Sequence, residues 1–127
     1  MLFRSLENGV ISKEDFHSSK CLISDWSGVS MEYAFVFERP VIYIDVPQKI
    51  LNDEMEKIPL VPLEVSIREK IGYVINPKNL NDIPKILTEV DNELRTEEIR
   101  RIRSQTVFNI GTSAEVGSKY ILKILNG

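Results

Sequence analysis

Residues 21–33 read CLISDWSGVSMEY, and they combine a strand, a bend of small polar residues and the start of a helix. Apolar side chains at consecutive positions in Cys21–Ser24 predict a short strand that is covered on both faces. The residues Asp25–Gly28 break this pattern, and a helix is expected over Val29–Phe37. This order is typical of an α/β unit built on a parallel sheet.

Two more strands and five more helices can be placed around this unit. Arg39-Pro40 ends the first helix, because proline removes a donor and disfavours helix at the residue before it. Val41–Val46 is β-branched and aromatic and is the strongest strand candidate, and Tyr73–Ile75 is the third. Further helices are expected over residues 12–20, 64–71, 83–90, 96–110 and 112–125, with one helical turn over 52–57.

The alternation of strands and helices predicts an α/β fold, namely a three-layer Rossmann-like parallel sheet with helices on both faces. We expect residues 1–127 to form a single lobe. Three clear strands are fewer than the five or six that are usual for a doubly wound domain. The expectation is therefore that the first strands precede residue 1, so that the chain is a fragment of a longer protein.

Composition excludes several classes of protein. A net charge of −3 without a basic stripe disfavours a nucleic-acid partner, and the cluster Arg100, Arg101 and Arg103 lies among acids, as on a solvated helix face. The single cysteine fits a reducing compartment. No apolar run approaches the roughly 20 residues of a membrane span. The expected location is the cytoplasm or the cytoplasmic face of the membrane, with membrane association only through the parent protein.

The bend before the predicted helix is a candidate anion site. A helix start has free backbone N–H groups and the positive end of the helix dipole, and small residues let a phosphate approach them closely. The hydroxyls of Ser27 and Ser30 could bind phosphate oxygens, and Glu32 could accept ribose hydroxyls. The alternative is structural: Asp25 or Ser27 only caps the helix, and Glu32 only favours its N-terminus.

Two other side chains leave two interpretations open. Arg68 lies four residues after Glu64, as in a surface ion pair, but its guanidinium also suits a donor phosphate. Trp26 could stack on a base or pack between helix and sheet. The only histidine, His17, is interpreted as a surface or partly packed residue and not as a general base. No metal site, cofactor or catalytic residue is predicted.

The segments Ser24–Gly28, Glu32–Phe35 and Glu38–Asp45 together resemble the signature of the CDP-glycerol glycerophosphotransferase family, best known from teichoic acid synthesis. The resemblance is strong from Cys21 to Pro47 and weaker to the end of the chain. It implies the C-terminal half of a GT-B fold, in which two Rossmann-like lobes bind a nucleotide-activated donor between them. Gly28 replaces a serine that many members carry.

The resemblance also implies roles for individual residues. Ser27, Gly28 and Ser30 would face the pyrophosphate of CDP-glycerol or a similar donor, and Glu32 would face the ribose. Asp25 and Arg68 belong to the same predicted donor-binding set. An acceptor hydroxyl on a cell-envelope polymer would attack the β-phosphorus, and CMP would leave.

The family's catalytic histidines lie upstream of this signature, so the chain alone is expected to lack a complete active site and to need a missing N-terminal lobe. Two alternatives stay open. The chain could be a non-catalytic module of the same fold that binds a nucleotide or a protein, or a lobe of a sugar-nucleotide GT-B enzyme.

Overall fold

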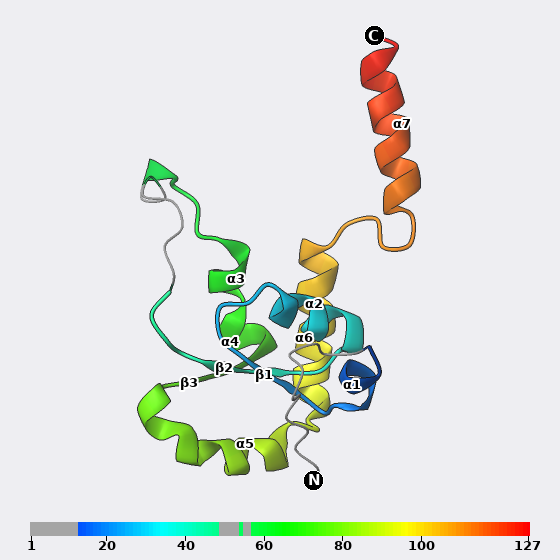
Figure 1. Cartoon of the computed structure of the whole chain (residues 1–127). Coiled ribbons are helices and arrows are strands. Elements are labelled where there is room, and N and C mark those ends of the chain that lie inside the picture. Colours follow the sequence, from blue (N-terminus) through cyan, green and yellow to red (C-terminus); the bar gives the residue numbers. More distant parts are fainter. Residues whose placement is uncertain (1–12, 49–53, 55–56) are drawn as a thin grey trace.

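A small parallel sheet forms the centre of the chain (Figure 1). The structure, a computed structural model, describes residues 13–48, 54 and 57–127. The sheet has the strand order β1-β2-β3, with β1 at Leu22–Ser24, β2 at Val41–Ile44 and β3 at Gly72–Ile75. Both pairs are parallel, and Val41 lies opposite Leu22 on one side and Gly72 on the other. The three predicted strands are thus confirmed.

Most helices lie close to the places that the sequence predicts, but the helix predicted over 64–71 is divided, the helix predicted over 96–110 is shifted toward the N-terminus, and the 3-10 helix before residue 83 was not predicted. The helical segments are α1 Lys13–Ser18, α2 Val29–Phe37, α3 Leu63–Ser66, α4 Arg68–Ile71, the 3-10 helix η2 Pro77–Asp82, α5 Ile83–Glu89, α6 Glu93–Thr106 and α7 Ser113–Leu125. The single helix predicted over 64–71 is wrong, because Ile67, at φ −107°, separates α3 from α4. The helical turn predicted over 52–57 lies mostly outside the described residues.

Helices pack on both faces of the sheet. Side chains alternate along β2, so that Val41 and Tyr43 face a core shared with α2, α4 and α6, whereas Ile42 faces the other side. On that second side Ile75 and Val90 are buried, and α5 packs against them. The chain is therefore a mixed α/β protein with a three-stranded parallel sheet flanked by helices. A full Rossmann-like or GT-B architecture remains a prediction.

The contact between β2 and β3 requires glycine at one position. A Cβ atom on Gly72 would lie 2.1 Å from the carbonyl oxygen of Val41 and 3.0 Å from the ring of Tyr43. Its φ of −166° is ordinary extended backbone, so the constraint is space and not conformation. The absence of a side chain lets β3 start close against β2.

Arg100 and Arg103 join α6 to the end of α2. Glu38, which follows α2 in the left-handed conformation at φ 54°, accepts hydrogen bonds from Arg100 at 2.6 Å and Arg103 at 2.8 Å. Arg103 also donates to the carbonyl of Phe35 at 2.6 Å. The hydrogen bond from Arg100, followed by that from Arg103, lowers the pKa of the Glu38 carboxyl, although its partial desolvation opposes the shift. The basic cluster of α6 is thus engaged in ion pairs, as a helix face rich in both charges predicts.

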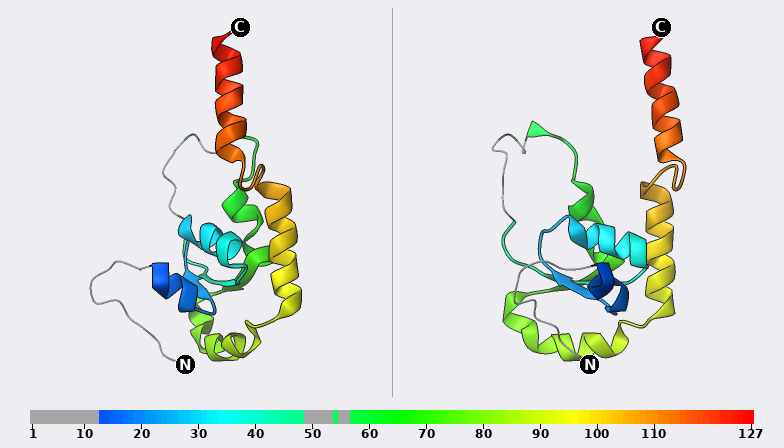
Figure 2. Two further views of the ribbon diagram at one scale, coloured as in Figure 1. Left: turned by 90° about the vertical axis from the view of Figure 1, so that its right-hand side faces the viewer. Right: turned by 45° about the vertical axis from the view of Figure 1, so that its right-hand side comes forward.

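The C-terminal helix α7 stands apart from the rest of the described structure (Figures 1 and 2). Every residue from 107 to 127 is exposed, including the apolar side chains of the helix. The connection before it contains two residues at positive φ, Asn109 at 56° and Gly111 at 80°. No helix within the described part of the chain is long and apolar enough to cross a membrane.

Candidate functional site: the bend between β1 and α2

The bend after β1 presents free backbone amides to solvent. The N–H groups of Ser30 and Met31 donate to the carbonyls of Ser27 and Gly28 at 3.1 and 3.2 Å, which closes the first turn of α2. Earlier in the bend, the amides of Ser27, Gly28 and Val29 have no acceptor among the residues that the structure describes. Free amides at a helix start are the groups that bind anions.

No side chain caps this helix. Gly28 occupies the N-cap position, and neither Asp25 nor Ser27 donates or accepts a capping hydrogen bond there. The structural alternative, in which one of these two residues only caps α2, is therefore wrong. The reason is the register, since the helix begins at Val29 and places Gly28, which has no side-chain acceptor, at the capping position.

The outer side of the bend is open. Asp25, Ser27 and Gly28 are all exposed. A Cβ atom built on Gly28 would meet nothing within 4 Å, and its φ of −59° is accessible to any residue. No described side chain therefore fills the space beside Gly28.

Ser30 does not face this open side. Its side chain is buried, with 4% of the residue exposed, and its hydroxyl donates to the carbonyl of Ser27 at 2.6 Å. Burial raises the pKa of Tyr43, and Ser30 and Arg68 lower it to a smaller extent. Ser30 therefore lies on the buried side of α2 and not on the open side where contact with a pyrophosphate is predicted. Its role is to hold the bend in shape.

Arg68 is buried next to the bend with two of its nitrogens unpaired. Only 6% of the residue is exposed, and its Nη1 donates to Asp45 at 3.1 Å. Its Nε and Nη2 atoms have no partner among the described residues. The predicted pair with Glu64 is wrong, because the break at Ile67 removes the continuous helix on which positions four apart would be neighbours.

Trp26 covers this guanidinium. The indole ring stacks on Arg68, with the guanidinium carbon 3.7 Å from the ring centroid, and Tyr43 lies at 4.9 Å. The indole N–H donates to the carbonyl of Val46 at 2.7 Å. Trp26 therefore connects the bend to the chain just after β2. In this conformation a phosphate can touch the bend amides, but it can reach Nε and Nη2 of Arg68 only if the indole moves.

A buried cation with one carboxylate partner is an unfavourable arrangement by itself. Desolvation of a charged group is compensated only when its hydrogen bonds are satisfied, and Asp45 satisfies one nitrogen of three. Stacking on Trp26 and Tyr43 adds a cation–π contribution of about 1–2 kcal/mol. The two unpaired nitrogens remain suited to oxygen atoms of an anion, for which the guanidinium fork is well shaped.

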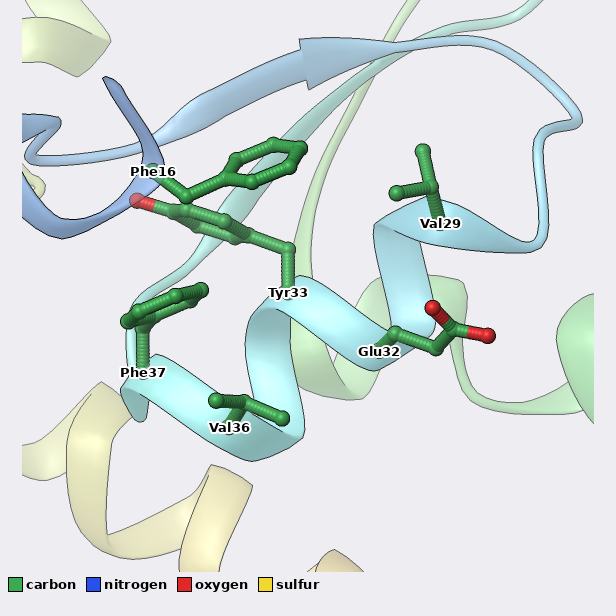
Figure 3. Close-up of a pocket in the computed structure, with 6 residues that line it drawn as sticks. All are labelled: Phe16, Val29, Glu32, Tyr33, Val36 and Phe37. Atoms are coloured by element: carbon green, nitrogen blue, oxygen red, sulfur yellow. The ribbon is translucent and has the colours of Figure 1, made fainter. Parts of the chain in front are cut away.

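Glu32 lies one turn beyond the bend on an exposed face of α2. It lines a shallow groove between α1 and α2, together with Phe16, Val29, Tyr33, Val36 and Phe37 (Figure 3). Its carboxylate has no hydrogen bond or ion pair within the described part of the chain. The group is thus free to bind either a ribose hydroxyl or a cation.

His17 lies on α1, away from the bend. It is exposed, and its ring contacts the edge of Phe37 with the centroids 5.0 Å apart. This placement agrees with the interpretation of His17 as a partly packed surface residue. Among residues 13–48, 54 and 57–127, no group of three or more histidine, cysteine, aspartate or glutamate side chains is arranged to hold a metal ion.

Sequence reasoning missed Asp45 and Tyr43 as parts of this cluster. A signal for Asp45 was present, because it follows β2 directly, and the carboxyl ends of parallel strands meet at one edge of the sheet. Asp25 follows β1 in the same way. No comparable signal marks Tyr43. Its ring lies near Arg68 because side chains alternate along β2 and Tyr43 points to the core that α4 shares.

The fold and the bend together define a class: an α/β protein with an open, anion-compatible helix start at the carboxyl edge of a parallel sheet. Comparisons with protein-family models, with curated proteins and with solved structures found no match to this chain. A more specific identity is therefore a matter for proposal.

Proposed function

We propose that this chain is the donor-binding lobe of a transferase that carries glycerol phosphate from CDP-glycerol, or a similar nucleotide-activated donor, to a cell-envelope polymer. The observation that supports the proposal is the set of free amides of Ser27, Gly28 and Val29 at the open start of α2. In this proposal they receive the diphosphate, and the hydroxyl of the exposed Ser27 adds one more donor. The resemblance of Ser24–Asp45 to the CDP-glycerol glycerophosphotransferase family suggests which diphosphate it is.

The remaining residues of the predicted set have distinct proposed roles. Glu32, exposed and unpaired among the described residues, binds the ribose hydroxyls. Arg68 provides positive charge beneath the bend and binds the phosphate directly once the Trp26 indole has moved aside. Asp25 borders the same open surface. Ser30 supports the bend through the Ser27 carbonyl and does not contact the donor.

Catalysis itself is assigned to another part of the parent enzyme. The single histidine of the chain packs against Phe37 on the α1 side, away from the bend. A base must lie within hydrogen-bond reach of the acceptor hydroxyl. We therefore propose that an N-terminal lobe contributes it, and that the isolated chain binds donor without turning it over. The parent would act in the cytoplasm or at the cytoplasmic face of the membrane.

A second candidate is a non-catalytic nucleotide-binding module of the same fold. The observation that favours it is the cover of Trp26 over Arg68, which keeps the two unpaired nitrogens of Arg68 away from a ligand in the conformation seen. Such a module would bind the nucleotide without the help of Arg68.

Nuclear magnetic resonance titration of the ¹⁵N-labelled chain tests the proposal. CDP-glycerol, CMP and inorganic pyrophosphate are added separately, and we expect CDP-glycerol to shift the amide signals of Ser27, Gly28 and Val29. A flat response of these amides to all three compounds would refute it. The side-chain signal of Arg68 and the fluorescence of Trp26, the only tryptophan of the chain, report whether the indole moves. Binding without either change supports the module instead.

Two substitutions at one position provide the matched control. Gly28→Pro removes a free amide without breaking an internal hydrogen bond, and the φ of −59° suits proline. Gly28→Ala keeps the amide and meets no atom within 4 Å. Because a hydrogen bond to a charged group contributes about 1.5–3 kcal/mol, we expect Gly28→Pro to weaken donor binding by roughly 10- to 100-fold and Gly28→Ala to leave it unchanged. Equal affinity of the two variants for the donor would show that this amide does not bind it.

A further inference from the structure

The helix α7 has an apolar face that nothing in the described structure covers. Val116, Tyr120 and Ile124 follow one another at intervals of four residues and are 43%, 65% and 63% exposed. Side chains spaced in this way lie on one face of a helix. A stripe of contiguous exposed apolar side chains marks an interaction site.

The groove between α1 and α2 is a concave apolar surface on the same chain. Five of its six lining residues are apolar or aromatic, and Val36 is 68% exposed at its edge (Figure 3). Its cavity of about 130 Å³ is close to the size that accommodates a benzene ring, so it can receive one aromatic or branched side chain. The sixth lining residue, Glu32, carries the only charge of the groove lining.

The groove carries one negative charge, and the apolar face of α7 carries one positive charge. On α2, Val29, Glu32 and Val36 occupy positions i, i+3 and i+7, so that one carboxylate stands between two valines. On α7, Lys123 lies on the same face as Val116 and Tyr120, at i+7 and i+3 from them. In the part of the chain that the structure describes, neither Glu32 nor Lys123 has an ionic partner. Lys119, by contrast, pairs with Glu115 at 2.5 Å.

The segment before α7 favours a contact with another molecule over a contact within the chain. Asn109 and Gly111 both have positive φ, and together they direct α7 away from the body (Figures 1 and 2). Both residue types adopt this conformation readily, so the turn is not strained. In this arrangement α7 does not reach the groove of its own chain, since all residues from 107 onward are exposed.

We propose that two copies of this chain form a closed dimer in which α7 of each copy lies in the α1–α2 groove of the other. Tyr120 fills the apolar cavity between Phe16 and Val36, and Lys123 forms an ion pair with Glu32. A reciprocal exchange of one element between two copies satisfies both apolar surfaces at once and leaves no open end for further growth.

The test uses charge reversal at both partners without nucleotide present. Sedimentation equilibrium is measured on the whole chain and on the variants Glu32→Lys and Lys123→Glu. We expect the unmodified chain to be a dimer and each single variant to dissociate at least tenfold more readily, because two like-charged pairs then face each other. An equimolar mixture of the two variants should regain the dimer, since each mixed dimer contains one native and one reversed ion pair.

Each other result overturns the proposal. A monomeric unmodified chain at all concentrations would show that α7 has no partner in a second copy. If the doubly reversed variant regains thermal stability but the mixture of single variants stays monomeric, α7 binds the groove of its own chain. If the single variants dimerise like the unmodified chain, the dimer uses another surface. Circular dichroism of each variant checks that the fold is intact.

The dimer inference does not rest on the proposed donor site, and nucleotide-free conditions keep the two apart. On one chain, Glu32 cannot bind a ribose and pair with Lys123 of a second copy at the same time. Addition of CDP-glycerol to the dimer is therefore a separate measurement, and its outcome concerns the ribose contact alone.

Discussion

Substitution of Gly72 by alanine tests the packing of the sheet most directly. The new Cβ atom would lie 2.1 Å from the carbonyl oxygen of Val41, whereas ordinary contacts of this kind lie at about 3.4–4 Å. The obstacle is a backbone atom and not the end of a flexible side chain, so β2 and β3 must separate by about 1 Å or more. Hydrogen-bonded strands lie only about 4.7–4.9 Å apart, so this separation would strain the hydrogen bonds between them. The ring of Tyr43, at 3.0 Å, blocks a sideways shift.

Overpacking of a core typically destabilises by about 1–3 kcal/mol. Because the obstacle here is a backbone oxygen in a ladder, we expect Gly72→Ala to lower the free energy of unfolding by about 3 kcal/mol. For a chain of this length that corresponds to a fall in Tm of roughly 10–15 °C. Thermal unfolding followed by circular dichroism measures it.

Gly28→Ala is the matched control for this prediction. The same change of glycine to alanine meets no atom within 4 Å at Gly28, and the backbone there is already helical. We expect its Tm to stay within about 2 °C of the unmodified chain, because only the small backbone-entropy effect of the substitution remains. If Gly72→Ala melts at the same temperature as Gly28→Ala, β3 does not approach β2 as closely as 2.1 Å from the Cβ position of residue 72 requires.

Two further predictions concern charged groups. Arg68→Met should leave the free energy of unfolding unchanged or increase it, because the substitution removes a buried cation with two unpaired nitrogens. Asp45 then stays in contact with water, since its side chain is 49% exposed. A loss of more than about 2 kcal/mol in chemical denaturation would contradict the unpaired state of this arginine. Glu38→Gln should be less stable than the unmodified chain at pH 7, and its free energy of unfolding should depend less on pH in acid. The pKa of Glu38 is lowered in the folded state, so this group contributes stability above its unfolded pKa and loses that contribution as the pH falls through the folded pKa. Denaturation curves of both proteins between about pH 7 and pH 3 measure this difference, and parallel curves would count against it.

The position of Trp26 gives the proposed site a specific physical character. The bend that carries the free amides also contains Trp26, whose indole ring covers the guanidinium of Arg68. An anion that settles on the amides would attract the guanidinium, and the only described hydrogen bond that holds the indole in place is its N–H donation to Val46. One such bond contributes about 1 kcal/mol, which is small beside a charge-assisted contact to phosphate.

Two of the expectations that the structure changes concern relations between segments. Ser30 was expected to face a ligand, but the rotation of α2 against the sheet turned it inward onto the Ser27 carbonyl. One of the two interpretations of Arg68 paired it with Glu64 on a single helix, but that helix is broken at Ile67 and Arg68 pairs with Asp45. In both cases the local pattern allowed the expected contact, and packing against distant residues decided otherwise.

The sequence by itself determined where the strands lie, where α2 begins and that a bend of small polar residues stands between them, because these features depend on residues within one or two turns of each other. Only the tertiary structure decided that Asp45, Trp26 and Tyr43 enclose Arg68, with Arg68 and Asp45 separated by 23 residues, and that α7 stays exposed. The physical reason is that a parallel sheet gathers the carboxyl ends of its strands at one edge, and no pattern along the chain states which side chains then meet there.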